Sequence, residues 1–530
     1  MAVGVRTESP ISRSGVCLIL VALTAFVFAQ TRQFTFLTFD DALYVTQNTH
    51  VRSGLTWATV PWAVRASVAG NWHPLTLLSH AFDSTLFGLA PAGPHLVNAA
   101  LHAVNAVLLF LLLAAATGEI LPSAVTAALF ALHPLHVESV AWISERKDVL
   151  STLFWLLSLG AWGYYTRQPS ARRLATALIA FGCALLAKPM AVTLPLTLLC
   201  IDIWPLQRMG AVRPGRLMVE KIPFFVLSFA GALLSVFTQR DAGALMDPAA
   251  FPLLRFANAV FTYVWYLGKA VWPYGLACFY PHPGATLSLW KAGASALFMA
   301  TATVRAWRAR TKQPYVLAAW LWYVLTLVPV IGILQVGGQG MADRYTYVPL
   351  MGPFAAAAWA SSRGLSRRAS GAFACGWILV LGCFAMLARM QAATWRDDVS
   401  LFSQAVAARP DNGLAYNNLA QALYREGRVG EARRNLELAL RITPPRADTH
   451  NNLGLLLLST GELTEAISHL RLAVDIEPRN PQAHRNLGDA LFRQGKRNEA
   501  IFHLREALRI APDYTNASTL LGEVLRSPGR

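Results

Sequence analysis

The chain has 530 residues, of which 55% are hydrophobic and only 14% are charged, whereas a soluble domain carries about 25% charged residues. Its formal net charge is +17, but the basic residues of the first 390 positions gather in short loops between apolar runs. Short basic loops mark the cytoplasmic side of membrane proteins, so the charge favours a membrane topology over nucleic-acid binding. The sequence contains no P-loop, GxSxG, Rossmann glycine pattern or zinc-ligand motif, which argues against a soluble nucleotide-driven enzyme.

Composition divides the chain into two domains. Residues 1–390 consist mostly of apolar runs, whereas residues 395–530 have the composition of an ordinary soluble helical protein. We therefore predict an all-α fold in which a polytopic transmembrane helical bundle precedes an α-solenoid. Five of the six cysteines lie inside apolar runs without CxxC or Cys/His spacing, so we expect neither a disulfide framework nor a structural metal.

Twelve apolar segments are candidate membrane spans: 16–30, 96–115, 121–135, 149–165, 174–189, 190–206, 222–238, 257–273, 290–304, 315–334, 345–360 and 371–389. The first follows two arginines and is expected to be an uncleaved signal anchor with a cytoplasmic N-terminus. If 257–273 is re-entrant or interfacial, every basic loop falls inside the cell; these loops are 167–173, 208–221, 305–312 and 363–368. We therefore predict about eleven crossings, a bacterial inner-membrane location and an extracytoplasmic C-terminal domain.

The long segment between the first two spans carries an acidic pair, Asp40-Asp41. One carboxylate would act as general base toward an acceptor hydroxyl, while the other raises its neighbour's pKa or helps to bind a divalent cation. Alternatively, aspartate caps a helix that begins at Ala42. His73, in the Asn71-Trp72-His73-Pro74 element of the same segment, is a further candidate for substrate binding. The residues alone leave the catalytic and the capping interpretations open.

The second span is polar along one face. His95, Asn98, His102 and Asn105 are spaced by three, four and three residues, so they share one side of a helix. Polar groups inside a membrane usually face the bundle interior or a wet cavity. These side chains therefore either line a substrate cavity or form hydrogen bonds between helices, and both interpretations remain open.

Charged side chains recur on the predicted outer side, against the positive-inside trend. One function for cations there is to bind a lipid-linked phosphate and to stabilise the charge that develops as it leaves. The alternative is pairing with nearby carboxylates, as in Glu145-Arg146-Lys147-Asp148. The candidates for substrate binding are His136, Glu138, Arg146, Lys147, Lys188 and Arg344.

The C-terminal domain shows a period of 34 residues. Leu-small pairs recur, the small residues being Ala420, Gly454, Gly488 and Gly522. Alanines and then prolines follow at constant offsets, the prolines at 444, 478 and 512. This register is typical of tetratricopeptide repeats (TPRs), which stack into a concave surface that binds peptides or partner helices. Five asparagines precede the pairs and are interpreted either as peptide-binding groups or as solvated helix surface: Asn417, Asn418, Asn451, Asn452 and Asn486.

Several motifs together resemble the transmembrane-and-TPR-containing protein O-mannosyltransferase family, in a prokaryotic-looking form, over residues 34–525. Besides the TPRs, they are Asp40-Asp41, Trp72-His73-Pro74-Leu75-Thr76, the segment from His133 to Trp142, Glu145-Arg146-Lys147-Asp148 and Ala342-Asp343-Arg344-Tyr345-Thr346-Tyr347. That family is similar to the GT-C glycosyltransferases. These multi-span enzymes take a sugar from a polyprenyl- or dolichyl-phosphate carrier and use an acidic motif in the first outer loop.

The resemblance implies a glycosyltransferase that moves a sugar from a polyprenyl-phosphate carrier to protein Ser/Thr hydroxyls. That the sugar is mannose is implied by the family name alone. It implies Asp40 or Asp41 as the base, and it implies an acceptor or partner protein bound by the TPRs. The carrier phosphate would be held by Arg146, Lys147, Lys188 and Arg344. No cofactor is implied beyond a candidate divalent cation. One alternative is a non-catalytic TPR scaffold for envelope assembly, and another is a transporter of lipid-linked sugars, which the lack of an obvious inverted repeat disfavours.

Overall fold

The apolar runs of the N-terminal part form helices whose ends are set by proline, glycine and polar residues. α5 (Ala92–Thr117), for example, begins after Pro91 and ends at Gly118, whose φ of +77° gives the left-handed C-cap that glycine favours. The computed structural model describes residues 12–241, 243, 252–333, 337–362, 367–442 and 446–527. Pro444 of the predicted repeat register and residues 363–366 of a predicted basic loop therefore lie outside the described residues.

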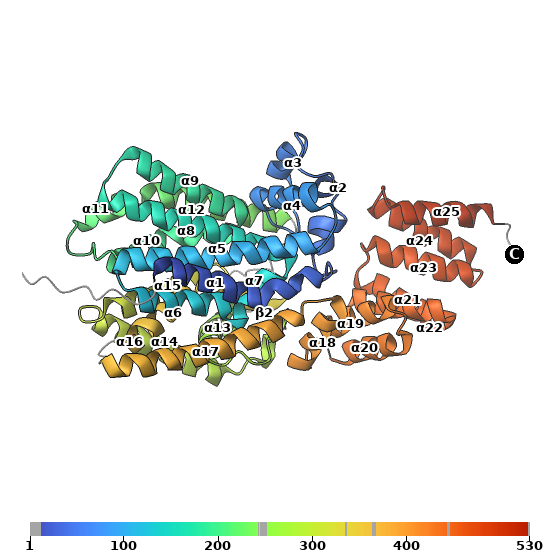
Figure 1. Ribbon diagram of the computed structural model, residues 1–530. Coiled ribbons are helices and arrows are strands. Elements are labelled where there is room, and N and C mark those ends of the chain that lie inside the picture. Colours follow the sequence, from blue (N-terminus) through green and yellow to red (C-terminus); the bar gives the residue numbers. More distant parts are fainter. Residues whose placement is uncertain are drawn as a thin grey trace, which may run out of the picture. The chain divides into compact units, whose positions relative to one another are not determined.

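The chain divides into two units, Met1–Asp397 and Asp398–Arg530, and each is described by itself. In the first unit, α5 packs against α1 and α8, and α8 packs against α9, so these helices lie side by side (Figure 1). The other helices of this unit are α1 (Arg13–Phe28), α2 (Thr49–Arg52), α3 (Thr59–Arg65), α4 (Pro74–Phe87), α6 (Ile120–Leu132), α7 (Val137–Ala141), α8 (Arg146–Arg167), α9 (Ala171–Ala187), α10 (Leu194–Ile203), α11 (Pro214–Val219), α12 (Ile222–Asp241), α13 (Pro252–Val271), α14 (Leu289–Ala309), α15 (Pro314–Leu327), α16 (Met351–Ser362) and α17 (Arg367–Ala393).

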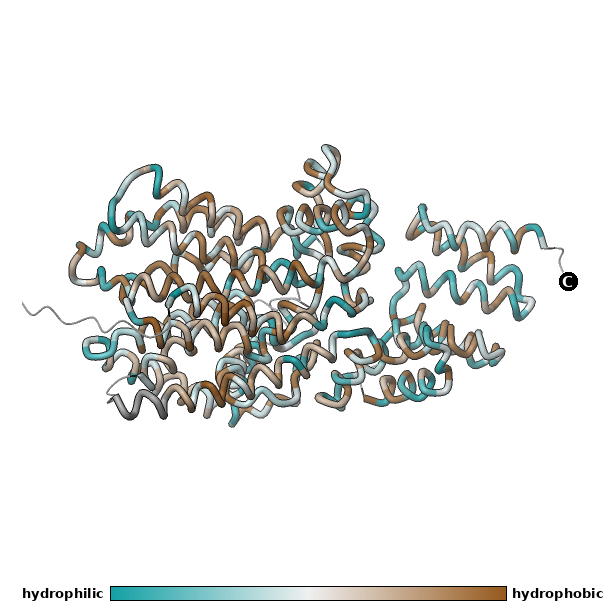
Figure 2. The backbone as a smooth tube through the Cα atoms, viewed as in Figure 1, coloured by the Kyte–Doolittle hydropathy of each residue, from teal (hydrophilic) through white to brown (hydrophobic). Residues whose placement is uncertain are grey.

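Four helical stretches in the described residues are long and apolar enough to cross a membrane, and a bent pair adds a fifth if it forms one span. The four are Arg13–Gln33, Ala92–Thr117, Ile222–Asp241 and Ala374–Ala393, and the pair is Ile120–Leu132 with Pro134–Ala141. Apolar residues extend along the helices of this unit in Figure 2. The all-helical prediction and the presence of apolar membrane helices are confirmed, whereas the count of eleven crossings stays a prediction.

Several elements of the first unit break at one end of the bundle and place polar residues there. A 3₁₀ turn, Ile143–Glu145, leads directly into the N-terminus of α8, and α9 stops at Ala187 just before Lys188. A short antiparallel pair, β1 (Tyr280–Pro281) and β2 (Gln339–Met341), precedes the turn Asp343–Thr346. These breaks bring loop residues that are distant in sequence into one neighbourhood.

The second unit consists of antiparallel helix pairs, as the 34-residue period predicts. At Gly454 and Gly488 an added Cβ would lie 2.6 and 2.8 Å from the Cγ atoms of Leu470 and Leu504, which explains why the register requires a small residue where the helices touch. Its helices are α18 (Asp398–Ala408), α19 (Gly413–Arg425), α20 (Val429–Ile442), α21 (Ala447–Thr460), α22 (Leu463–Ile476), α23 (Pro481–Arg493), α24 (Arg497–Ile510) and α25 (Thr515–Arg526).

The repeat asparagines form contacts that neither sequence interpretation anticipated. The Asn452 amide donates to Asn417 Oδ1 at 2.9 Å, and the Asn486 amide donates to Asn451 Oδ1 at 2.8 Å. Asn417, Asn451 and Asn486 are buried. Each bond joins the first helix of one repeat to the first helix of the next, so the amides connect successive repeats.

Candidate active site

The two adjacent aspartates occupy different environments. Asp41 is fully buried, and its carboxylate accepts hydrogen bonds from Leu37 N (2.9 Å), Ser144 N (3.0 Å) and Ser144 Oγ (2.5 Å). Burial raises the pKa of Asp41 to about 7, although these hydrogen bonds oppose the shift. Although Asp41 precedes the helical turn Ala42–Thr46, its side chain makes no capping bond there, so the capping interpretation is wrong for Asp41. Asp41 instead connects the segment between α1 and α2 to the turn before α8.

Asp40 points into a cavity. The cavity has a volume of about 450 Å³, and Asp40 lines it together with Glu145, Lys147, Lys188 and Arg344. Burial raises the pKa of Asp40 above its ordinary value, while the ammonium of Lys147 opposes the shift. Asp40 adopts a φ of +67°, which is uncommon for a residue with a side chain, although Asp is among those that tolerate it best. Backbone strain of this kind is concentrated at functional sites.

Glu145 gathers three cations on one wall of this cavity. Its carboxylate lies 3.0 Å from Lys147 Nζ, 3.5 Å from Lys188 Nζ and 3.3 Å from Arg344 Nε. These cations lower the pKa of the buried Glu145 against the effect of desolvation, which is the largest single influence. The carboxylate is therefore held as an anion with the cations arranged around it.

The cations are also fixed from behind. Arg344 Nη1 lies 2.5 Å from Glu138 Oε1, and the Arg344 guanidinium lies over the Trp142 ring at 5.5 Å. The Lys147 ammonium lies 5.0 Å from the centre of the Tyr44 ring, and Lys188 pairs with Asp148. Carboxylates and aromatic faces thus hold these charged groups at the cavity wall.

Much of the remaining lining of the cavity is apolar. α12 contributes Ala232, Ser235, Val236 and Gln239, whose spacing puts them on one face of the helix. The segment 329–332 after α15 also contributes Pro329, Val330 and Gly332. The cavity therefore combines cations that could bind a phosphate with apolar residues that could contact a hydrocarbon.

Among the other predicted site residues, only His73 lines the cavity. His73 is fully buried and stacks on Tyr44, with ring centres 5.3 Å apart. Burial lowers the pKa of His73 to about 3, and Lys147 adds to the shift. His73 is consequently neutral at ordinary pH.

Arg146 is oriented away from the cavity. It is fully buried and donates hydrogen bonds to Asp83 (2.7 Å), Ser79 (2.8 Å) and Pro94 O (2.9 Å), besides Asn98. Four of its five N–H donors are occupied by these partners, which fits the pairing interpretation better than phosphate binding. Asn98, one of the polar residues of the second span, thus bonds between helices.

His102 and His136 also lie inside the bundle and do not line the cavity. His102 bonds to Tyr347 Oη at 2.7 Å and to Ala131 O at 3.1 Å, and His136 bonds to Phe130 O at 2.8 Å. Glu138 is buried and acts through Arg344, whose backbone N–H it also accepts at 3.0 Å. Glu138 therefore positions Arg344, whereas His102 bonds between elements inside the bundle, as the interhelical interpretation of the second span implies.

Several lining residues were not among the predicted site residues. Gln339 accepts from Arg344 Nη2 at 3.2 Å, and Tyr345 lies under the Arg344 guanidinium. Trp142 lines the cavity and donates to Phe39 O at 2.8 Å. No group of three or more His, Cys, Asp or Glu side chains arranged for a metal ion occurs among the described residues, so the divalent cation stays a prediction.

Comparison with known proteins supports both halves of the sequence interpretation. Tetratricopeptide repeat models match residues 388–447 and 445–513. Drosophila melanogaster protein O-mannosyl-transferase Tmtc1 is 25% identical over 492 residues, covering 72% of this chain and 55% of the relative. Human TMTC1 is 26% identical over 513 residues (83% and 57%), and mouse TMTC2 is 33% identical over 205 residues (37% and 24%). The resemblance to this group is confirmed, and the chain spans about half the length of the TMTC1 relatives.

A solved structure of an Archaeoglobus fulgidus oligosaccharyltransferase aligns with 82% of this chain and 59% of its own length. The TM-score is 0.41 and the sequence identity is 14%, so the likeness carries no argument about this site.

Proposed function

We propose that this chain is a membrane glycosyltransferase that moves a sugar from a polyprenyl-phosphate carrier to a serine or threonine hydroxyl of a protein outside the cytoplasm. Its likeness to curated protein O-mannosyl-transferases makes mannose the first sugar to test. The observation that carries the proposal is that Asp40 shares one cavity with Lys147, Lys188 and Arg344. A base and a phosphate-binding wall thereby face the same space.

Asp40 is the proposed general base. Its pKa is raised by burial, and a carboxylate whose pKa lies closer to the working pH accepts a proton more readily. The acceptor hydroxyl oxygen forms a bond to the anomeric carbon of the sugar while its proton passes to the Asp40 carboxylate. The bond from the anomeric carbon to the phosphate oxygen breaks, and its electron pair leaves with the polyprenyl phosphate. Asp41 has the supporting role of fixing the loop.

Lys147, Lys188 and Arg344 are the proposed phosphate ligands. The negative charge on the leaving phosphate rises as the sugar departs, so fixed cations stabilise the transition state more than the ground state. Glu145 keeps the three cations together. Arg146, whose donors bond inside the bundle, is omitted from this set.

The apolar part of the cavity lining supports a lipid-linked donor over a soluble one. α12 is a candidate membrane span, and residues elsewhere along it, such as Phe229 and Phe237, are largely exposed on the unit's surface. A cavity whose wall is a lipid-facing helix gives a carrier lipid lateral access, with its phosphate reaching the cations. The TPR unit is the proposed binding surface for the acceptor or a partner protein, since TPR stacks bind peptides.

The test is transfer by purified protein reconstituted in lipid, with radiolabelled polyprenyl-phosphate mannose and glucose as donors and envelope proteins as acceptors. The proposal expects label on serine or threonine, with one donor preferred. Absence of both transfer and carrier binding across the panel would contradict it and favour the non-catalytic TPR scaffold. The scaffold also predicts that removal of residues 398–530 abolishes the cellular function while Asp40→Asn leaves it intact.

A further inference from the structure

A second cavity lies inside the first unit, away from Asp40. It has a volume of about 310 Å³ and is enclosed by the distal half of α5, the C-terminal half of α8, the end of α10 and parts of α15 and α16. Its lining is dominated by leucine, alanine, glycine and tryptophan. Among the described residues that line it, Arg167 alone is charged.

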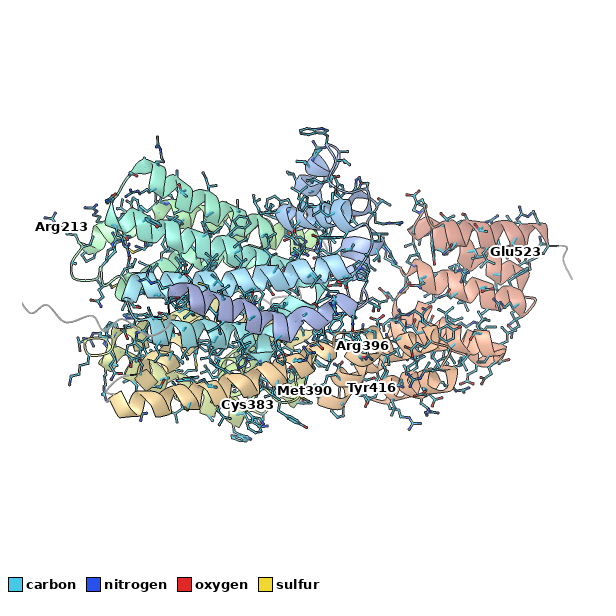
Figure 3. All side chains as sticks on the ribbon, viewed as in Figure 1. Arg213, Cys383, Met390, Arg396, Tyr416 and Glu523 are labelled. Atoms are coloured by element: carbon cyan, nitrogen blue, oxygen red, sulfur yellow. The ribbon has the colours of Figure 1, made fainter. Side chains whose placement is uncertain are left out.

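The charged end of this cavity, at Arg167, is separated from the candidate active site by about the thickness of a bilayer. Lys147 and Arg167 lie at opposite ends of α8, and the helical rise puts them about 30 Å apart. The hydrocarbon core of a membrane is also about 30 Å thick. Figure 3 labels residues at the two ends of this unit, Arg213 and Arg396, and the Arg396 carbonyl accepts from Thr35 in the outer segment. The second cavity therefore belongs to the leaflet opposite Asp40.

The space arises from missing side chains. Gly160 and Gly163 of α8 line the cavity, and a Cβ added at Gly163 would meet no atom within 4 Å. Tyr164, the residue after Gly163, also lines the cavity and is largely exposed. An apolar channel that opens at the surface of a membrane bundle accommodates a hydrocarbon chain, because water there would leave its hydrogen bonds unmade.

The charge at the rim of the cavity indicates which kind of headgroup the bound hydrocarbon chain carries. Arg167 is exposed, and its Nη2 donates to Ala115 O at 3.2 Å, so this contact leaves its charge uncompensated. In contrast, Arg208 of the next loop pairs with Asp202 at 3.2 Å and with Glu220 at 2.6 Å. Arg167 also belongs to the basic loop 167–173, which the sequence assigns to the cytoplasmic side, where anionic lipids attract cations.

We propose that this cavity binds one acyl chain of an anionic phospholipid from the cytoplasmic leaflet, with the lipid phosphate against Arg167. The site is independent of sugar transfer, since its residues do not line the Asp40 cavity. It gives the bundle a lipid as a structural ligand at the end where α5, α8 and α10 terminate.

The test is native mass spectrometry of the purified full chain loaded with phosphatidylglycerol or phosphatidylcholine. Arg167→Gln is expected to lower retained phosphatidylglycerol about fivefold, the effect of one arginine near an anionic lipid, and to leave phosphatidylcholine unchanged. Gly163→Leu fills the cavity and is expected to reduce both lipids. Leucine has a higher helix propensity than glycine, and the added side chain enters open space. This variant is therefore expected to keep the fold.

Two matched variants serve as controls. Gly182→Leu changes another glycine with no atom near its Cβ position, on α9, and Arg305→Gln changes an exposed arginine on α14; neither residue lines the cavity. Both are expected to retain lipid as the wild type does. Unchanged retention in Gly163→Leu would overturn the proposal. A second result would also overturn it: polyprenyl phosphate displaces phosphatidylglycerol from the wild type, and Gly163→Leu no longer retains polyprenyl phosphate. The cavity would then bind the donor.

Discussion

The different environments of the two aspartates predict that the same substitution at each affects different properties. Asn in place of Asp41 can accept from Ser144 with its amide oxygen, but its NH₂ then faces the Leu37 N–H, which loses its acceptor. A buried donor without a partner costs about 1–3 kcal/mol. Asp41→Ala leaves all three donors unpaired and costs roughly 3 kcal/mol or more by the same reasoning.

Asp40→Asn is the matched control. Asparagine tolerates a positive φ as aspartate does, and Asp40 faces the cavity, so we expect a change in unfolding free energy within about 0.5 kcal/mol. Thermal unfolding of the purified chain in detergent, followed by tryptophan fluorescence, measures the difference. The midpoint should fall by several degrees in Asp41→Ala, less in Asp41→Asn and hardly in Asp40→Asn. The assignment of a structural role to Asp41 alone would be refuted if Asp41→Ala had the wild-type midpoint. It would also be refuted if Asp40→Asn lowered the midpoint as much as Asp41→Ala does.

Three further predictions concern titration, donor binding and the repeats. The pKa of Asp41 is about 7 in the folded chain and about 3.9 in an unfolded one. The stability that this raised pKa contributes is therefore full below about pH 4 and is lost as the pH rises to about 7. The thermal midpoint of the wild type should fall over this pH range, and the midpoint of Asp41→Asn should not. Lys188→Gln removes one phosphate ligand and should raise the donor KM about tenfold, the value of a charge-assisted hydrogen bond, with a smaller change in kcat; an unchanged KM in steady-state assays would exclude Lys188 from the donor site. Gly488→Ala brings a Cβ within 2.8 Å of Leu504 Cγ and should destabilise the repeats by about 1–3 kcal/mol, whereas Gly522→Ala, where the added Cβ meets only the end of an arginine at 3.9 Å, should not; equal melting of the two variants would contradict the packing argument.

Local patterns were sufficient to predict the helical architecture. The 34-residue register identified the positions where Gly454 and Gly488 touch the opposing helix. It could do so because the two helices pack in the same way in each successive repeat. It did not predict the amide bonds between Asn452 and Asn417 or between Asn486 and Asn451. Those bonds depend on the twist between successive repeats, which one-dimensional spacing does not record.

The sequence identified the charged residues near the site but not the directions in which their side chains point. Arg146 and Lys147 are adjacent, yet Arg146 bonds to Asp83 inside the bundle while Lys147 lines the cavity. Successive residues of a helix point about 100° apart, so a charge cluster in sequence necessarily divides between directions. Ser144, which holds Asp41, and Gln339, which holds Arg344, carry no sequence signal because they meet their partners only through the tertiary fold.

The central claim is that Asp40 accepts the proton of the acceptor hydroxyl. The most direct measurement is the rate of sugar transfer from a polyprenyl-phosphate donor by wild type, Asp40→Asn and Asp41→Asn in lipid, each at saturating donor, with donor binding measured in parallel. The account predicts that Asp40→Asn lowers kcat by about 10²–10⁴-fold, the contribution of a general base, while it retains its fold and binds the donor. Full activity of Asp40→Asn would contradict the account.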